Sequence, residues 1–359
     1  MGFKTEISKI HYDKAAKGGF FALLKFCSLF YALGSGLKNK LYENNISKPK
    51  KVNAYVISVG NLTTGGVGKT PVVAQIANYL IDKGEKVAIV SRGYGSELSK
   101  KARTKTCCAP IMPLSSRVNL ISDGEHIFFN AKMAGDEPLW LAENTKAIVI
   151  TTKNRFKGAE FAIENFGVTK IILDDGFQHR KLHRDLDIVL IDSEMGFGNE
   201  NLLPAGPLRE GLEAFKRIDK LVVVSKSTDH TRAEKYAKIM GKKLKKETVV
   251  CYSEPSFAYN IFKLEEKLEA GESVIAFSAI GQPQQFYKFL KEYEVLDTVD
   301  FDDHHNYTQA DVDELLKSGV KKFVTTEKDA SKLTNLDFKH AKVFALKLQT
   351  KLDVEKLLK

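Results

Sequence analysis

A glycine-rich loop between an apolar segment and an amphipathic one constrains the fold of this chain more than any other feature. The loop lies within residues 58–71 and follows an apolar run at 56–59 that predicts a β-strand. The segment after the loop predicts a helix, because its apolar residues share one helical face: Val72, Val73, Ile76 and Leu80. Strand, glycine-rich loop and helix in this order are typical of a phosphate-binding loop, in which backbone N–H groups surround phosphate oxygens.

The loop sequence also predicts which residues hold a nucleotide, either ATP or GTP. Thr63 stands where the template G-x-x-x-x-G-K-[ST] has its first glycine, so Gly65 and Gly66 are expected to supply the tight turn. Lys69 is expected to reach the terminal phosphates, and the Thr70 hydroxyl to ligate Mg²⁺. The alternative is an ordinary glycine-rich turn without a ligand. The full predicted nucleotide-binding set is Thr63, Thr64, Gly65, Gly66, Val67, Gly68, Lys69 and Thr70.

Strand and helix patterns alternate along the first two thirds of the chain. Short apolar runs, separated by helical or loop segments, occur at 86–91, 147–151, 170–173, 187–192 and 221–225. This alternation is typical of a doubly wound, mostly parallel sheet, and with the phosphate-binding loop it predicts a P-loop NTPase-like α/β fold.

A change in composition predicts a second, smaller domain. From about residue 227 the chain becomes lysine-rich, and the strand pattern then restarts near 274–277. We therefore expect an N-terminal helical region over 1–45, a phosphate-loop domain over 46–226 and a smaller α/β domain over 227–359.

Positive charge concentrates at the N-terminus. The net charge of the chain is +10, and residues 1–51 contain ten lysines against three acidic residues. Within this basic region, residues 20–33 form a bulky apolar run that Lys25 interrupts. The run is shorter than the ~20 residues that a membrane-crossing helix needs. We therefore expect a helix that lies in the membrane surface, with its lysines at anionic headgroups; the alternative is a helix of the protein core.

Composition excludes several other classes of protein. With 43% hydrophobic and 28% charged residues, the chain is expected to be globular rather than disordered. Its cysteines lack both metal-ligand spacing and the density of a disulfide scaffold, which favours a reducing, cytoplasmic compartment: Cys27, Cys107, Cys108 and Cys251. Nucleic-acid binding is not expected, because no aromatic residues interleave with the lysine run after residue 227.

Two acidic pairs are candidates for chemistry. Asp174 and Asp175 end an apolar strand, as do the NTPase carboxylates that hold Mg²⁺ or its water; the alternative is a simple strand-to-turn junction. Asp136 and Glu137 precede a proline, where a carboxylate can accept a proton from an attacking hydroxyl. The alternative for this second pair is a helix N-cap.

Two further segments carry candidate groups. Arg209 is suited to stabilising the charge of a transferring phosphoryl group, and Glu210 to ligating Mg²⁺, although an exposed ion pair is the alternative. In the predicted second domain, His304 follows Asp303, an adjacency that can tune a base but that also occurs in ordinary surface pairs.

Taken together, these motifs resemble the tetraacyldisaccharide 4′-kinase family, in order and over most of the chain. The motifs lie at 60–71, 91–95, 135–138, 174–179, 208–210, 303–305 and 326–330. The run Asp-Asp-Gly-Phe-Gln-His at 174–179 is more specific than the phosphate-binding loop itself. The family is also similar in lacking the first template glycine and in carrying a basic, apolar N-terminal helix.

The resemblance implies a reaction and a location. ATP, with Mg²⁺, would give its γ-phosphoryl group to the 4′-hydroxyl of a tetraacylated glucosamine disaccharide 1-phosphate, forming lipid IVA in lipid A biosynthesis. The enzyme would be peripheral at the cytoplasmic face of the inner membrane, with anionic lipid and no nucleic acid as partners.

The resemblance also implies residue roles. Asp136 would be the general base, and His304 would position or tune it across an interdomain cleft that the second domain closes. Lys69 and Arg209 would act on the transferring phosphate. The metal-associated residues would be Thr70, Glu210, Asp174 and Asp175.

The main alternative function is a membrane-associated P-loop nucleotide switch that works by dimerisation. Thr64 occupies the position of the signature lysine of such switches, which counts against this alternative. A nucleic-acid-binding ATPase and a cytosolic small-molecule kinase are further alternatives; the first predicts salt-sensitive binding to DNA or RNA.

Overall fold

The computed structural model describes residues 7, 10–93, 96–100, 118–227, 229–281, 283–302 and 305–359. Contacts divide the chain into two compact units. The first unit comprises Met1–Ser225, Thr231–Cys251 and Leu352–Lys359, and the second comprises Lys226–His230 and Tyr252–Lys351. This division differs from the predicted boundary at 226, because apolar side chains of residues 231–251 and 352–359 pack into the core of the first unit.

The first unit contains a mostly parallel sheet, as predicted. Its strand order is β8-β7-β6-β1-β5-β2-β4-β3, where β8 spans Glu247–Asn260. Among the pairings from β7 to β3, only that between β3 and β4 is antiparallel. β1 lies between β5 and β6, so the phosphate-binding loop after β1 starts beside the end of β5. The strands are β1 (Tyr55–Asn61), β2 (Val87–Ser91), β3 (Val118–Ser122), β4 (Ile148–Thr152), β5 (Lys170–Asp174), β6 (Leu186–Asp192) and β7 (Lys220–Ser225).

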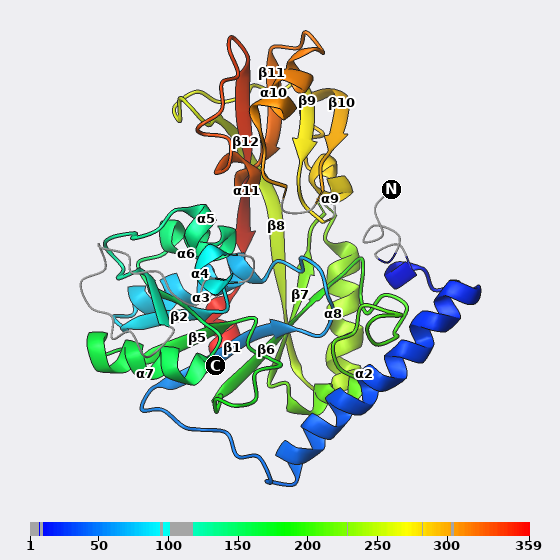
Figure 1. Ribbon diagram of the computed structural model, residues 1–359, viewed down its shortest axis with the longest axis vertical. Helices are drawn as coiled ribbons and strands as arrows, with labels where there is room; N and C mark the ends of the chain where they lie inside the picture. The colour runs from blue at the N-terminus through cyan, green and yellow to red at the C-terminus, as the bar shows by residue number, and fades with distance from the viewer. Residues whose placement is uncertain are drawn as a thin grey trace. The chain divides into compact units, whose positions relative to one another are not determined.

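Helices cover both faces of this sheet (Figure 1). The alternation of side chains along the strands divides the core: on β1, Ile57 and Val59 face one layer and Val56 faces the other. The first layer contains α3 (Lys69–Asp82), α6 (Asp136–Asn144) and α12 (Val354–Leu358). The second contains α7 (Arg155–Phe166), α8 (Thr231–Leu244) and the 3-10 helix η1 (Leu212–Arg217). Two short helices also contribute side chains to the first layer: α4 (Glu97–Lys100) and α5 (Ala131–Ala134).

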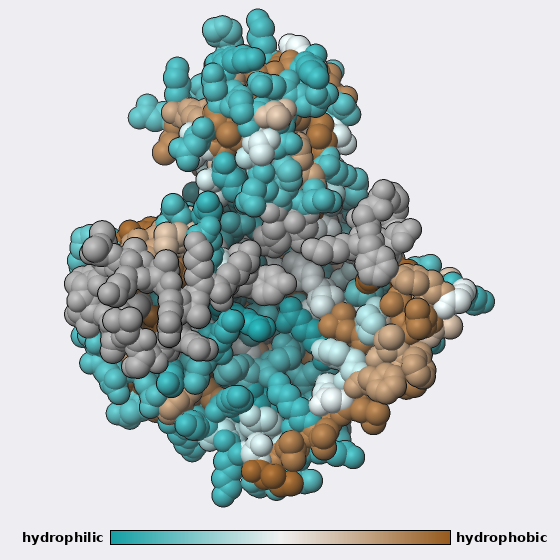
Figure 2. Space-filling model, in the orientation of Figure 1, coloured by the Kyte–Doolittle hydropathy of each residue, from teal (hydrophilic) through white to brown (hydrophobic). Residues whose placement is uncertain are grey.

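A long N-terminal helix, α2 (Gly19–Glu43), belongs to the first unit and extends beyond the predicted apolar run. Only one of its apolar side chains, Leu24, is buried, and a continuous apolar surface follows the helix in Figure 2. Within the described residues, α2 is the one helix whose length and composition would allow it to cross a membrane.

The second unit is a smaller α/β sandwich. Its strand order is β10-β9-β11-β12-β8, parallel except for the β12/β8 pair. The strands are β8 (Glu247–Asn260), β9 (Ser273–Ser278), β10 (Glu294–Asp300), β11 (Lys322–Thr326) and β12 (Lys342–Lys351). Its helices are α9 (Pro283–Lys288), α10 (Gln309–Leu316) and α11 (Glu327–Ala330), and apolar clusters cover both faces of the sheet.

Gly60, near the end of β1, allows the close approach of the segment that follows β5. A Cβ atom at Gly60 would lie 2.6 Å from the Cβ and 2.9 Å from the backbone nitrogen of Phe177, a fully buried residue. Gly60→Ala is therefore expected to lower the free energy of unfolding by about 1–3 kcal/mol, as overpacking does, measured by urea titration. Gly36→Ala is the matched control, because a Cβ there meets nothing within 4 Å; an equal loss at both positions would contradict this account.

Candidate functional site

The loop between β1 and α3 has the backbone of a phosphate cradle. Gly65 (φ 110°) and Gly68 (φ 90°) both have positive φ values, which glycine adopts without steric cost. Gly68 precedes the first residue of α3, Lys69, so Lys69 and Thr70 occupy the first turn of the helix. The free N–H groups and the dipole of a helix N-terminus favour an anion at this point.

Lys69 and Arg209 converge on the carboxylate of Asp175. Lys69 Nζ lies 3.4 Å from Asp175 Oδ1, while Arg209 Nη1 lies 2.9 Å from Oδ1 and 2.7 Å from Oδ2. Burial by itself would raise the pKa of Asp175, but the charges of Lys69 and Arg209 hold it below its ordinary value. Asp175 also has a φ of 53°, a left-handed conformation that is uncommon outside glycine.

Two amide side chains connect these groups to the loop. Lys69 Nζ donates to Asn61 Oδ1 at 3.2 Å, and Asn61 Nδ2 donates to the Thr63 carbonyl at 2.7 Å. Gln178 Nε2 donates to the Asn61 carbonyl at 2.9 Å. The sequence analysis gave no role to Asn61, although its position at the end of the strand before a phosphate-binding loop was a usable signal.

Asp174 ends β5 and is buried, with 2% of its surface exposed. Burial, followed by the negative charge of Glu137, raises the pKa of Asp174 to about 7, and the positive charge of Lys69 partly opposes this shift. Asp136 and Glu137 begin α6, after Gly135. The two acidic pairs of the sequence analysis are therefore near enough for Glu137 and Asp174 to interact electrostatically.

The segment 207–210 pairs with the phosphate-binding loop. Thr64 N donates to the Pro207 carbonyl and Arg209 N to the Leu62 carbonyl, each at 2.7 Å. This pairing places the Arg209 side chain beside Asp175. The sequence alone could not predict this pairing, because 143 or more residues separate the two paired segments.

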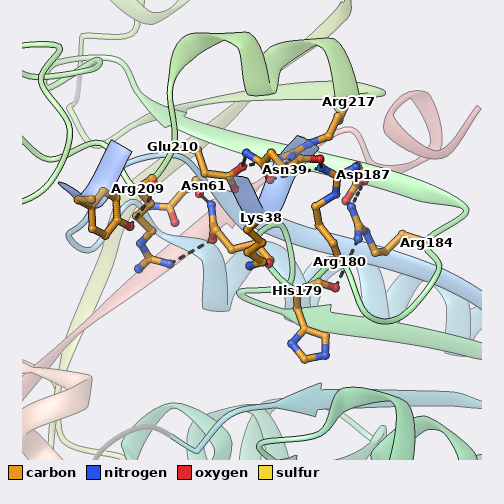
Figure 3. A network of polar contacts seen from close by, with 12 residues as sticks. Lys38, Asn39, Asn61, His179, Arg180, Arg184, Asp187, Arg209, Glu210 and Arg217 are labelled. Atoms are coloured by element: carbon orange, nitrogen blue, oxygen red, sulfur yellow. Dashed lines mark hydrogen bonds and ion pairs between the residues drawn. The ribbon is translucent and has the colours of Figure 1, made fainter. Parts of the chain in front are cut away.

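Glu210 lies in a polar network with residues from two other elements (Figure 3). Its Oε2 accepts hydrogen bonds from Asn39 Nδ2 and Arg217 Nη2, each at 2.8 Å. Its Oε1 is buried and has no hydrogen-bond partner in the described part of the chain. The sequence analysis missed Asn39 and Arg217, which carry no motif.

The predicted metal-associated residues do not form a cage made of protein alone. Within the described ranges, no group of three or more histidine, cysteine and acidic residues could hold a metal ion. The donors present fit Mg²⁺ nevertheless, because this ion is commonly held by one or two carboxylates together with substrate phosphates and water. Thr70 in the first turn of α3, the buried Asp174 and the unpartnered Glu210 Oε1 are such donors.

The second-unit candidate His304 lies outside the described residues, as do Asp303, Tyr94 and Gly95 and the cysteines 107 and 108. The neighbouring His305 is described. Its Nε2 lies 3.1 Å from Asp311 Oδ2, and its ring stacks on Phe301. These contacts hold His305 against α10.

His179, in the segment after β5, predicts a pH dependence of stability. Burial, followed by the charges of Arg155 and Lys38, lowers the pKa of His179 to about 4. The imidazole of His179 therefore binds a proton more tightly in the unfolded chain than in the folded protein. As the pH falls from about 6.5 to about 4, the free energy of unfolding should decrease by at most ~1.4 kcal/mol per pH unit. Urea titrations across this range would measure the slope, and His179→Gln should reduce it. An unchanged slope in that variant would contradict the assignment.

Comparisons with known proteins agree over nearly the whole chain. A family model described as tetraacyldisaccharide-1-P 4′-kinase matches residues 20–359. The tetraacyldisaccharide 4′-kinase of Syntrophus aciditrophicus is 36% identical over 341 residues, covering 89% of this chain and 86% of that protein. The tetraacyldisaccharide 4′-kinase of Geobacter metallireducens is 36% identical over 329 residues, covering 87% of this chain and 88% of that protein. The crystal structure of "apo" form LpxK from Aquifex aeolicus in complex with ATP matches with a TM-score of 0.72 and 32% identity, over 95% of this chain and 97% of that one.

Proposed function

This chain belongs to the tetraacyldisaccharide-1-phosphate 4′-kinase family, and we propose that the site around Lys69, Asp175 and Arg209 carries out its phosphoryl transfer. The protein is an ATP-dependent kinase of lipid A biosynthesis, which phosphorylates the 4′-hydroxyl of tetraacyldisaccharide 1-phosphate. Family membership favours this activity over the membrane-associated nucleotide switch.

One observation carries the assignment of the site: Lys69 and Arg209, from segments far apart in the sequence, meet at Asp175 beside a helix N-terminus. Phosphoryl transfer requires mainly positioning and neutralisation of the phosphate oxygens. The β- and γ-phosphates of ATP would lie over the loop 63–70, with Lys69 and Arg209 neutralising the charge that moves to the leaving oxygen. Asp175 keeps both cations in place until the nucleotide binds.

Magnesium, when bound, would supply further positive charge to neutralise the phosphate oxygens. Thr70, Asp174 and Glu210 would hold it, directly or through water, and Asp175 would orient the surrounding groups. A carboxylate must be ionised to contribute here; burial and the charge of Glu137 oppose that form of Asp174, and the positive charge of Lys69 favours it.

Asp136 is our candidate general base. The proton of the acceptor 4′-hydroxyl passes to its carboxylate as the oxygen forms a bond to the γ-phosphorus and the bond between that phosphorus and the ADP oxygen breaks. The position of Asp136 in the first turn of α6, next to a residue that interacts with Asp174, supports this role. His304 is proposed to tune Asp136, on the basis of the family motif.

We expect the enzyme to act as a peripheral protein at the cytoplasmic face of the inner membrane. The acceptor carries four acyl chains and stays in the bilayer. The exposed apolar surface of α2 supports this location, with basic residues at Lys25 and Lys40 to meet anionic headgroups.

The apolar surface of α2 predicts a loss of vesicle binding when it is made polar. Replacing Phe26, Leu29 and Leu33 by serine should weaken binding to anionic vesicles at least about tenfold, because each apolar side chain contributes on the order of 1 kcal/mol on insertion. Vesicle sedimentation measures this. Leu264→Ser is the control, an equally exposed leucine of the second unit. Equal binding by the triple variant and wild type would contradict the role of α2.

Transfer of labelled γ-phosphate from ATP to tetraacyl disaccharide 1-phosphate, in mixed micelles with Mg²⁺, tests the proposed function directly. Labelled lipid is expected, and an acceptor already phosphorylated at the 4′ position should give none. Hydrolysis of ATP without labelling of the unphosphorylated acceptor would contradict the kinase assignment.

A further inference from the structure

Helix α2 has two faces of different character. One face exposes large apolar side chains, among them Leu33, which is 71% exposed. The other carries Ser28, Tyr31 and Asn39, whose spacings of three and eight residues keep them on one side of a helix. Each of these three side chains makes a hydrogen bond to a residue between 202 and 210. The polar face of α2 is therefore attached to the segment that contains Arg209 and Glu210.

Tyr31 holds the backbone of Arg209. Its hydroxyl donates to the Arg209 carbonyl at 2.9 Å, while the Arg209 N–H donates to the Leu62 carbonyl at 2.7 Å. The backbone of Arg209 is thus held from the helix on one side and from the phosphate-binding loop on the other. Its guanidinium group reaches Asp175 from this fixed position.

Asn39 is the centre of the contacts around Glu210, and all of its side-chain polar atoms have partners. Its Nδ2 donates to Glu210 Oε2 at 2.8 Å, and its Oδ1 accepts from Arg217 Nη1 at 3.2 Å and Arg180 Nη1 at 3.3 Å. Asn39 is 9% exposed and Glu210 is 4% exposed. In Figure 3 the side chains of Asn39, Glu210 and Arg217 point toward one another. Because these groups are buried, loss of the amide would leave a carboxylate and two guanidinium groups with fewer partners.

From these contacts we propose that Tyr31 and Asn39 are positioning residues for phosphoryl transfer: they hold Arg209 and Glu210 in the geometry that the reaction needs. The inference rests on the proposed function and deepens it. Helix α2 then has two separate tasks, because its apolar face contacts lipid and its polar face completes the site. A displacement of about 1 Å in a catalytic group can cost a hundredfold in rate, so a small loosening of this segment has a large effect on turnover.

The test separates turnover from membrane attachment. Asn39→Leu replaces the amide by an apolar group of the same branched shape but larger volume, and Tyr31→Phe removes only the hydroxyl. Ser35→Ala is the matched control, since the Ser35 hydroxyl donates to Ala32 within the same helix. For each variant we measure the kcat and KM for lipid phosphorylation in mixed micelles, sedimentation with anionic vesicles and the midpoint of thermal unfolding.

We expect kcat to fall about 10- to 100-fold in Asn39→Leu and about 3- to 10-fold in Tyr31→Phe. Vesicle binding and the KM for the acceptor should stay within about twofold of wild type, because the lost interaction acts in the transition state. Ser35→Ala should match wild type.

Unchanged kcat in both folded variants would overturn the inference. A kcat that falls only in parallel with vesicle binding and thermal stability would also overturn it, because α2 would then act as an anchor alone. If Asn39→Leu does not fold, Tyr31→Phe and Asn39→Ser decide between these outcomes. The wild-type chain in the same assay reports on the proposed function by itself, so failure of that function is distinguishable from failure of the positioning role.

Discussion

Replacing Asp136 by asparagine is expected to lower kcat for lipid phosphorylation by about 10²- to 10⁴-fold, the usual contribution of a general base. Asparagine has the shape of aspartate but cannot accept the proton of the acceptor hydroxyl. The affinity for ATP should stay within about twofold, because a general base acts on the acceptor rather than on the nucleotide. The two measurements are single-turnover transfer of labelled phosphate and equilibrium binding of a fluorescent ATP analogue.

The control for this prediction is Glu143→Gln, which removes the same charge from the last turn of the same helix, α6. It should retain turnover near that of wild type. If Asp136→Asn and Glu143→Gln had equal kcat values, Asp136 would not be the base, and the acidic residues at the end of β5 would become the next candidates.

Replacing Lys69 by methionine is expected to lower kcat for the same transfer by about 10²- to 10³-fold, since it removes a charge aimed at the phosphoryl group. Methionine keeps most of the length of the side chain and loses only the ammonium group. ATP affinity should also fall, because Lys69 occupies the first turn of α3, where the phosphates are expected to bind. A further effect is expected on Asp175, whose pKa should rise when one of its two cations is absent.

Lys83→Met is the matched control, at the opposite end of α3 on an exposed side chain. If the folded Lys69→Met variant had wild-type turnover, the proposed role of the phosphate-binding loop in the reaction would be contradicted. Loss of ATP affinity alone, with kcat unchanged at saturating ATP, would restrict Lys69 to nucleotide binding.

Much of the fold was predictable because its signals are local. The apolar run before the loop, the glycines within it and the helical spacing of Val72, Val73 and Ile76 all lie within a short stretch of chain, and the structure has strand, loop and helix there. The parallel sheet was predictable for the same reason, since buried strands form continuous apolar runs. The division between the two units was harder to predict from the sequence, because β8 and α8 join a core whose other members lie far away in the sequence.

The sequence by itself determined the phosphate-binding loop, the acidic strand end at Asp174 and the apolar character of α2, because each depends on neighbouring residues. Only the tertiary structure decided that Arg209 meets Lys69 at Asp175, and that Asn39 of α2 holds Glu210. These contacts join residues separated by 34 to 171 positions. No local propensity encodes such pairs; they form because burial requires each charged or polar group to find a partner wherever the fold brings one.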